Sequence, residues 1–406
     1  MIIIFFKKNE SKEVTILKIG IDKIGFYTPG MYIDTGDLAK ARGVEPGKFK
    51  IGIGQDKMAV VPKTQDAVTL AANAALNILT QTDIDAIDYV IFATETGVDH
   101  SKAAGIFAHE LLGLKKAARS IEIKQACYSA TAGIQIAKGH IALNPDSRVL
   151  VLASDIARYG LKTGGEITQG AGAVAMVIAQ DPKIMTIENQ SVYQTDDAMD
   201  FWRPLYSDTA YVQGKFSVIQ YINFFKNLFA QYQEKTQTSL KDFDALAFHT
   251  PYAKMGLKAL QSVLVDADEA DEKRLLDYYE VGKHYNSIVG NIYTGSLYLN
   301  LISLLEQNKT LEAGSTIGLF SYGSGSVGEF FTGILQPDYR DYLNTDRHEQ
   351  MLEDREQISI ERYEEVFMDT IPSGVGDIEL DIDTDSAPIC LAGIKDHMRR
   401  YVNKQQ

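Results

Sequence analysis

Short apolar runs that end at turn residues alternate with helix-length segments along most of the sequence. Runs that are apolar throughout predict strands covered on both faces. We expect such strands at residues 89–94, 120–123, 149–153, 173–179, 245–248 and 316–320. We expect helices between them at residues 65–79, 102–112, 130–142, 219–233, 253–264 and 294–306. Covered strands interleaved with helices predict an α/β fold in which helices lie on both sides of the sheets.

The two halves of the chain repeat one pattern. Glu95 and His249 each follow the first strand of their half, whereas Cys127 and Asn291 each precede a helix rich in small residues. Any two α/β segments share some likeness of this kind, but here the reactive residues fall at matching positions. We therefore predict a duplicated fold whose halves bring these four side chains together at a shared seam.

Three segments follow from this pattern. We expect one half at residues 18–182 and the other at residues 183–406, the latter including an acidic, loop-rich C-terminal region. Within that region we expect a strand at 387–392 and a helix at 395–402. Residues 1–17 lack the alternation of the rest, so we expect a non-native or disordered extension that precedes the true translation start.

Charge and cysteine content exclude several classes of protein. A net charge of -14 argues against nucleic acid or an anionic membrane as a partner. Two cysteines are too few for a disulfide framework, and no Cys/His cluster suggests a metal site. No apolar run approaches the roughly 20 residues that a membrane-spanning helix needs. We therefore expect a cytoplasmic protein without a bound metal.

Cys127 lies in the segment KQACYSATAG, between a predicted strand and a predicted helix of small residues. This elbow places the thiol at a helix N-terminus, where the helix dipole and free N–H groups favour a thiolate. Buried cysteines are also common as inert core residues. The motif alone leaves nucleophile and core packing equally open.

Glu95 and His249 each lie at the end of a predicted strand. Burial at that edge would raise the pKa of Glu95 and suit it to proton transfer, although a single loop glutamate is more often solvated. His249 could act as an acid or polarise a carbonyl, or it could be a hydrogen-bonded structural residue. We expect the other histidines at the surface.

Two further features could contact a ligand. Lys254 and Lys258 share one face of the helix predicted after His249, where they could meet phosphate groups or simply face solvent. The glycines of residues 323–326 would let backbone N–H groups approach a ligand oxygen, as an oxyanion hole requires. The same loop could bind phosphate or form a plain tight turn.

Together these segments resemble the hydroxymethylglutaryl-CoA synthases, particularly those of bacteria. The motifs that carry the resemblance are IGIGQDKMAV, ATETGVD, EIKQACYSATAG, SDIARYG, TQGAGAVAM, DFWRP, FHTPYAKMG, VGNIYTGSLY and LFSYGSGSVGEF. The resemblance implies a thiolase-like, layered αβαβα fold of two similar halves, assembled as a homodimer. It implies acetyl-CoA and acetoacetyl-CoA as substrates, no cofactor, and a place in the mevalonate route to isoprenoids.

The resemblance also implies a role for each matching residue. Cys127 would carry the acetyl group, Glu95 would be the general acid/base, and His249 would contact acetoacetyl-CoA. Other residues fall in segments that line the substrate, contact CoA or support the site in this family. These are Tyr159, Thr168, Asn291 and Ser324 for the substrate, Lys254 and Lys258 for CoA, and Asp155 and Asp200 for support.

Three other functions share part of this pattern. A β-ketoacyl-carrier-protein synthase needs a cysteine, a histidine and an asparagine, but its decarboxylative condensation needs no base such as Glu95. A relative that performs the same aldol step on carrier-bound substrates in polyketide assembly is not distinguished by these residues. A non-catalytic acyl-CoA-binding protein would not require Cys127, Glu95 and His249 together.

Overall fold

The computed structural model describes residues 17–207, 209–265, 267–372 and 374–405. Apart from Leu17, the predicted extension at residues 1–17 lies outside the described residues. No helix in the described part of the chain is long and apolar enough to cross a membrane.

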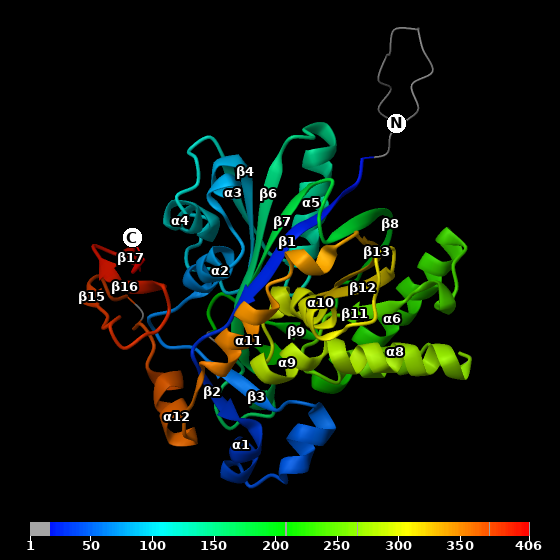
Figure 1. Cartoon of the computed structure of the whole chain (residues 1–406). Coiled ribbons are helices and arrows are strands. Elements are labelled where there is room, and N and C mark those ends of the chain that lie inside the picture. The colour runs from blue at the N-terminus through cyan, green and yellow to red at the C-terminus, as the bar shows by residue number, and fades with distance from the viewer. Residues whose placement is uncertain (1–16, 208, 266, 373, 406) are drawn as a thin grey trace.

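Nine strands of the described chain form one sheet that contains the same pattern twice (Figure 1). In sheet order they are β11 (Ala245–Phe248), β12 (Thr316–Gly323), β13 (Val327–Leu335), β8 (Met185–Thr195), β1 (Ile19–Tyr27), β7 (Gly170–Gln180), β6 (Arg148–Ala157), β4 (Ile87–Ala93) and β5 (Arg119–Ile123). The pairs β4–β6 and β11–β12 are parallel, whereas β6–β7, β7–β1, β12–β13 and β13–β8 are antiparallel. The repeated order and direction confirm the predicted duplication.

The two copies meet where β1 runs beside β8. Only a short stretch is paired there, with Gly20 opposite Thr186 and Ile21 opposite Met185. A Cβ atom on Gly20 would lie 2.0 Å from the carbonyl oxygen of Met185, so glycine permits this close approach. The strand pairing between the halves is therefore short, with the two backbones in close contact.

Alternate residues of the buried strands face different cores, as the two-residue period of a strand requires. In β4, Ile91 and Ala93 join a central core, whereas Val90 and Phe92 join an outer one. The central core is filled by α5 (Ser129–Leu143) and α10 (Ser296–Gln307). The outer layers are α2 (Ala67–Leu76) and α4 (Ala104–Leu111) on one side, and α6 (Gly214–Thr236), α7 (Met255–Gln261) and α8 (Glu269–Gly282) on the other. This succession of layers is the predicted αβαβα fold.

Small residues let α5 lie deep in the central layer. A Cβ atom on Gly133 would lie 3.2 Å from the side chain of Ile91 and 3.3 Å from that of Val151. Close packing of this kind explains why the helix that follows Cys127 is rich in alanine and glycine. Cys127 is thereby anchored to a rigid element rather than to a mobile loop.

Smaller elements surround this body. A second sheet contains β14 (Glu356–Gln357), β2 (Met31–Asp34) and β3 (Lys57–Val60), and a two-stranded ribbon contains β9 (Phe201–Trp202) and β10 (Tyr211–Val212). The remaining helices are α1 (Thr35–Ala41), α3 (Gln81–Ala86), α9 (His284–Val289), α11 (Thr345–Glu353) and α12 (Ile360–Met368), with a π-helical turn at Lys48–Ile53 and 3₁₀ turns at Glu166–Thr168, Leu240–Asp242, Tyr293–Gly295 and Tyr339–Tyr342.

Two predictions for the C-terminal region are wrong. His348 of α11 was expected at the surface with the other histidines, but it is fully buried. Both ring nitrogens have partners there: Nε2 accepts the Phe26 N–H, and Nδ1 lies 2.8 Å from Glu306. The predicted strand at 387–392 is present as β16 (Ile389–Lys395), but the predicted helix at 395–402 is the strand β17 (Met398–Asn403). Asp396 and His397 have φ values of 50° and 63°, the geometry of a two-residue hairpin turn, so the chain reverses instead of coiling.

Candidate active site

Cys127 lies at the elbow between β5 and α5, as predicted. The elbow requires a positive φ of 42° at Ala126, and the hydroxyl of Ser129 accepts the Gln125 N–H at 2.5 Å. Gly323 at the end of β12 packs against the elbow, where a Cβ atom would lie 2.6 Å from the Tyr128 nitrogen. The second half of the fold thus presses directly on the segment that presents the thiol.

Cys127 and Glu95 are in contact. The Sγ atom donates a hydrogen bond to Glu95 Oε1 at 3.6 Å. Burial and the repulsion from Asp155 raise the pKa of Glu95 to about 8, as predicted for a proton-transfer group. Burial and the charge of Glu95 raise the pKa of Cys127 well above its usual value, so the prediction that the elbow favours a thiolate is wrong for this state. A thiol with a raised pKa needs a base in order to react, and Glu95 is the carboxylate in contact with it.

Asp155, at the end of β6, anchors the loop that carries Glu95. Its Oδ1 accepts from the hydroxyls of Thr94 and Thr96 and from the N–H groups of Glu95 and Thr96, at 2.7 to 3.1 Å. Its Oδ2 accepts from both the N–H and the hydroxyl of Thr294, at 3.1 and 2.9 Å. One fully buried carboxylate therefore ties the Glu95 loop in the first half to an elbow in the second.

The structural counterpart of Cys127 in the second half is Thr294, not Asn291. Tyr293 has a φ of 41°, matching Ala126, and the Ser296 hydroxyl accepts the Ile292 N–H at 3.0 Å, matching Ser129. Cys127 and Thr294 each lie two residues before their helix begins. The pairing of Cys127 with Asn291, predicted from the sequences of the two halves, is therefore wrong by three residues. The sequence alone did not show at which residue the helix begins.

Asn291 nevertheless lies at the same seam. Its Oδ1 accepts from the Tyr293 N–H and the Ser296 hydroxyl, both at 2.9 Å, and its Nδ2 points to the Tyr159 hydroxyl at 3.5 Å. Burial and the nearby acidic groups of Cys127 and Glu95 raise the pKa of Tyr159, which therefore stays a neutral phenol.

The loop 323–326 is held against the Cys127 elbow. Gln125 Nε2 donates to the carbonyl oxygen of Ser324 at 3.3 Å. The fully buried Asp200 accepts from the Gly325 N–H and the Tyr322 hydroxyl, both at 2.9 Å. The predicted supporting role of Asp200 has a physical counterpart in these bonds, since they fix the glycine loop beside the nucleophile.

His249 follows β11 at the position that matches Glu95. Each residue lies two positions after an inward-facing alanine, Ala93 or Ala247. Burial lowers the pKa of His249 to about 3, so the ring is neutral and carries one N–H donor. Its Nδ1 has no hydrogen-bond partner among the described residues, although the ring is only 2% exposed. An unsatisfied ring nitrogen of this kind is available to a ligand.

The predicted phosphate-contacting lysines lie farther out. Lys254 is the residue before α7, and its side chain packs over Gly54 of the IGIGQ segment. Lys258 is exposed and donates to the Tyr252 hydroxyl at 2.8 Å. Thr168 donates its hydroxyl to the Gly165 carbonyl at 2.8 Å, within its own turn, and no described contact joins it to Cys127 or Glu95.

Arg203 is a site residue that the sequence reasoning missed. Its guanidinium group donates to the main-chain carbonyl oxygen of Glu95, and its charge opposes the rise in the pKa of Glu95. Arg203 belongs to the DFWRP segment. A single arginine in a loop has no spacing signal that would mark it as a functional residue.

A thiol at a helix N-terminus, in contact with a carboxylate on a duplicated αβαβα fold, defines a thiolase-like enzyme that transfers and condenses acyl groups. Comparison with known sequences narrows this class. The sequence model described as hydroxymethylglutaryl-coenzyme A synthase N terminal matches residues 16–183, and the corresponding C-terminal model matches residues 187–288 and 277–371. The chain belongs to the hydroxymethylglutaryl-CoA synthase family.

Individual relatives agree with this membership. The chain is 51% identical over 387 residues to the hydroxymethylglutaryl-CoA synthase of Enterococcus faecalis, covering 95% of this chain and 100% of the relative. It is 31% identical to the polyketide biosynthesis 3-hydroxy-3-methylglutaryl-ACP synthase of Bacillus subtilis, covering 91% and 93%. A crystal structure of an HMG-CoA synthase complexed with CoA superposes with a TM-score of 0.92 at 44% identity, covering 95% and 100%.

Proposed function

We propose that this protein condenses acetyl-CoA with acetoacetyl-CoA and water to give 3-hydroxy-3-methylglutaryl-CoA and CoA, as a step of the mevalonate route to isoprenoids. The observation that carries the proposal is the hydrogen bond between Cys127 and Glu95, a nucleophile beside a base of raised pKa. The 51% identity to the Enterococcus enzyme supports the choice of substrates.

In the first step, Glu95 accepts the proton of Cys127 while the sulfur attacks the carbonyl of acetyl-CoA. The tetrahedral oxyanion needs donors close to the elbow, against which the loop 323–326 packs. Collapse of the intermediate breaks the bond to CoA sulfur, which takes the proton back from Glu95. The products are acetyl-Cys127, free CoA and an ionised Glu95.

In the second step, Glu95 removes a proton from the acetyl methyl group, which the thioester makes acidic. The resulting carbanion attacks the C3 ketone of acetoacetyl-CoA, and the neutral imidazole of His249 donates a hydrogen bond to the ketone oxygen. Glu95 returns its proton to the new alkoxide. Water then cleaves the bond to Cys127, which releases the product and regenerates the thiol.

Other parts of the proposal concern binding and assembly. Tyr159, Thr168, Asn291 and Ser324 would line the substrate, and Lys254 and Lys258 would meet the CoA phosphates. The proposed steps use no metal or redox cofactor. We also propose that the protein is cytoplasmic. We further propose a homodimer, because β5 lies at the edge of the sheet, where its N–H and C=O groups could pair with a second copy.

Product identification tests the proposal. Purified protein should convert acetyl-CoA and acetoacetyl-CoA to 3-hydroxy-3-methylglutaryl-CoA, identified by mass spectrometry. Presenting the acetoacetyl group on free CoA and on an acyl carrier protein separates this function from that of the Bacillus relative, and we expect a clear preference for CoA. Absence of the product with acetoacetyl-CoA would refute the proposal.

The variant Glu95→Ala tests the role of Glu95 as the base in condensation. We expect it to accept an acetyl group on Cys127, although slowly, and to lose about 10³-fold in condensation, since general base catalysis contributes roughly 10² to 10⁴. Intact-protein mass spectrometry follows the acetyl adduct and product analysis follows the condensation. Turnover equal to the wild type would contradict the role given to Glu95.

A further inference from the structure

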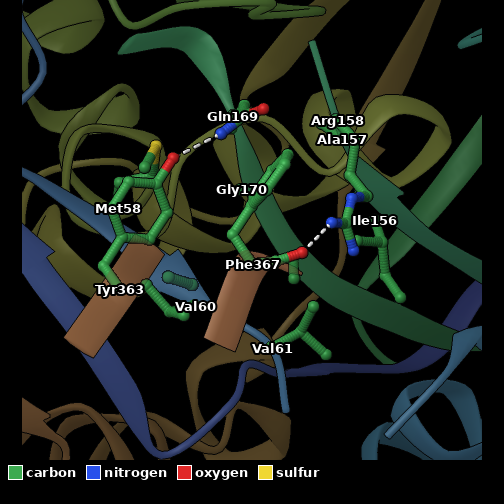
Figure 2. Close-up of a pocket in the computed structure, with 12 residues that line it drawn as sticks. Met58, Val60, Val61, Ile156, Ala157, Arg158, Gln169, Gly170, Tyr363 and Phe367 are labelled. Atoms are coloured by element: carbon green, nitrogen blue, oxygen red, sulfur yellow. Dashed lines mark hydrogen bonds between the residues drawn. The ribbon is translucent and has the colours of Figure 1, made fainter. Parts of the chain in front are cut away.

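The loop that carries Tyr159 is held by a helix of the acidic C-terminal region. The loop runs from Arg158 to Gln169, between β6 and β7, and α12 lies against it. Figure 2 shows both attachments: Gln169 meets Tyr363 near one end of the loop, and Arg158 meets the carbonyl oxygen of Phe367 at the other. The guanidinium group of Arg158 also stacks on the Phe367 ring at 3.9 Å.

A chain of hydrogen bonds leads from α12 to the catalytic seam. The Tyr363 hydroxyl accepts from Gln169 Nε2 at 2.8 Å. Gln169 Oε1 accepts the N–H groups of Tyr159 and Gly160, at 2.7 and 3.1 Å. Tyr159 in turn accepts from Asn291 Nδ2 at 3.5 Å. Tyr363 therefore sets the orientation of the amide that fixes the backbone of Tyr159.

A buried ion pair supports the same loop. Both oxygens of Glu166 accept from Arg42, at 2.8 Å each, and one also accepts the Lys162 N–H at 2.9 Å. The Tyr363 hydroxyl lies 3.3 Å from Glu166, and Arg42 reaches on to Glu364 of α12 at 2.7 Å. Two parallel hydrogen bonds fix the orientation of the Arg42 guanidinium group against Glu166. Since Arg42 also binds Glu364, the loop and α12 are held together as one rigid unit.

The packing beneath these bonds is tight. Ile360, Tyr363 and Val366 of α12 join a small core with Met58, Val60 and other apolar residues of the β2–β3 region. The cavity left between α12 and the loop holds only about 30 Å³ (Figure 2). With so little free space between them, a shift of α12 would disturb the loop.

We propose that α12 is a positioning element of the active site, in which Tyr363 acts through Gln169 to hold Tyr159 beside Asn291 for the acetoacetyl-CoA half of the reaction. This inference rests on the proposed function, because it takes Tyr159 as a residue that lines the substrate. It assigns the acidic C-terminal region a role in positioning the active site, which the sequence of that region does not indicate.

The test is Tyr363→Phe, which removes one hydroxyl and keeps the packed ring. The acetyl adduct on Cys127 should form at the wild-type rate, whereas kcat/KM for acetoacetyl-CoA should fall about tenfold, because the bonds of the hydroxyl to Gln169 and Glu166 are both lost. In a Tyr159→Phe background the same change should cost less than about twofold, because the group through which Tyr363 acts has already been removed.

Tyr339→Phe is the matched control. Tyr339 is as buried as Tyr363, lies in the same region, and donates its hydroxyl to Leu311 at 3.1 Å, away from the loop. It should lower the unfolding temperature by a similar amount and leave kcat/KM unchanged. Equal losses of kcat/KM in the two variants, or equal losses in the acetylation and condensation steps, would overturn the inference. Failure of the wild-type protein to form product would instead refute the proposed function.

Discussion

The elbows at Cys127 and Thr294 have nearly the same backbone but different surroundings. Both contain a residue at positive φ, 42° at Ala126 and 41° at Tyr293, and both are closed by a serine hydroxyl four residues after the N–H that it accepts. Cys127 is partly exposed and contacts Glu95, whereas Thr294 is 1% exposed and donates to Asp155.

The difference shows how a duplicated fold can divide its work. The first elbow presents a reactive group that is partly exposed. The second elbow places a hydroxyl where it braces the loop that carries the base for the first. The two elbows thus share one backbone geometry. The surroundings of Cys127 and Thr294 decide whether the side chain at that position reacts with a substrate or stabilises a neighbouring loop.

The largest effect should come from the reactive elbow. Cys127→Ser keeps the size of the side chain but replaces the nucleophile, and we expect at least a 10³-fold loss of product formation and no stable acetyl adduct. Incubation with acetyl-CoA followed by intact-protein mass spectrometry measures the adduct. Cys390→Ser is the control, because that thiol is buried and bonded to the Ala387 carbonyl, and it should still be acetylated at Cys127. An adduct on the Cys127→Ser protein would contradict the assignment.

The supporting elbow should give a smaller and selective effect. Thr294→Val removes the hydroxyl that donates to Asp155 and leaves the shape nearly unchanged. We expect condensation to slow about 10-fold to 10²-fold, since a small displacement of a catalytic group can cost this much. Substrate and product are followed by chromatography, with the acetyl adduct measured separately.

Thr332→Val is a control for the loss of a buried hydroxyl. Thr332 is 3% exposed and bonds to Tyr232, on the outer side of the second half. Both variants should lose some thermal stability, but only Thr294→Val should slow condensation. If the two variants behaved alike, Thr294 would have no role beyond packing, and the comparison between the elbows would fail.

The smallest expected effect concerns pH. Glu95 acts as a base when it is ionised, so the condensation rate should rise with pH and level off above its pKa of about 8. Burial and the charge of Asp155 disfavour the charged form of Glu95, whereas Arg203, the hydrogen bond from Cys127 and Lys124 favour it. Arg203→Met should therefore move the rise to higher pH by roughly one unit.

The measurement is the single-turnover condensation rate of the acetylated enzyme between pH 6 and 10. Arg400→Met, which removes an exposed arginine paired with Glu379, should leave the profile in place. A profile that stayed unchanged in Arg203→Met, or moved to lower pH, would show that Arg203 does not tune the base.

The sequence predicted covered strands interleaved with helices because its strands are apolar and its helices have clear lengths, whereas the order of the five layers came from the family resemblance. The strand predicted at 245–248 has the same bounds as β11, and the helix predicted at 130–142 differs from α5 by one residue at each end. The contact between Cys127 and Glu95 was anticipated because reactive residues fall at matching positions of two halves that meet at a shared seam. Periodicity and strand edges are local signals that survive without a structure.

What the sequence could not predict depends on distant contacts. The counterpart of Cys127 was misplaced at Asn291 because only the Ile292–Ser296 hydrogen bond shows where the helix starts. The thiol lacks a lowered pKa because burial and Glu95 outweigh the helix dipole, a balance that no local motif contains. Arg203 and Tyr363 reach the site from loops and helices far away in the chain.

The hydrogen bonds of Asp155 affect when catalytic activity returns during refolding. It draws four hydrogen bonds from the Glu95 loop and two from Thr294, so its environment is complete only after both halves have docked. Each half can acquire its helices and strands earlier, since those depend on nearby contacts. On refolding, catalytic activity should therefore return later than the circular dichroism signal, and its rate should report the docking of the halves.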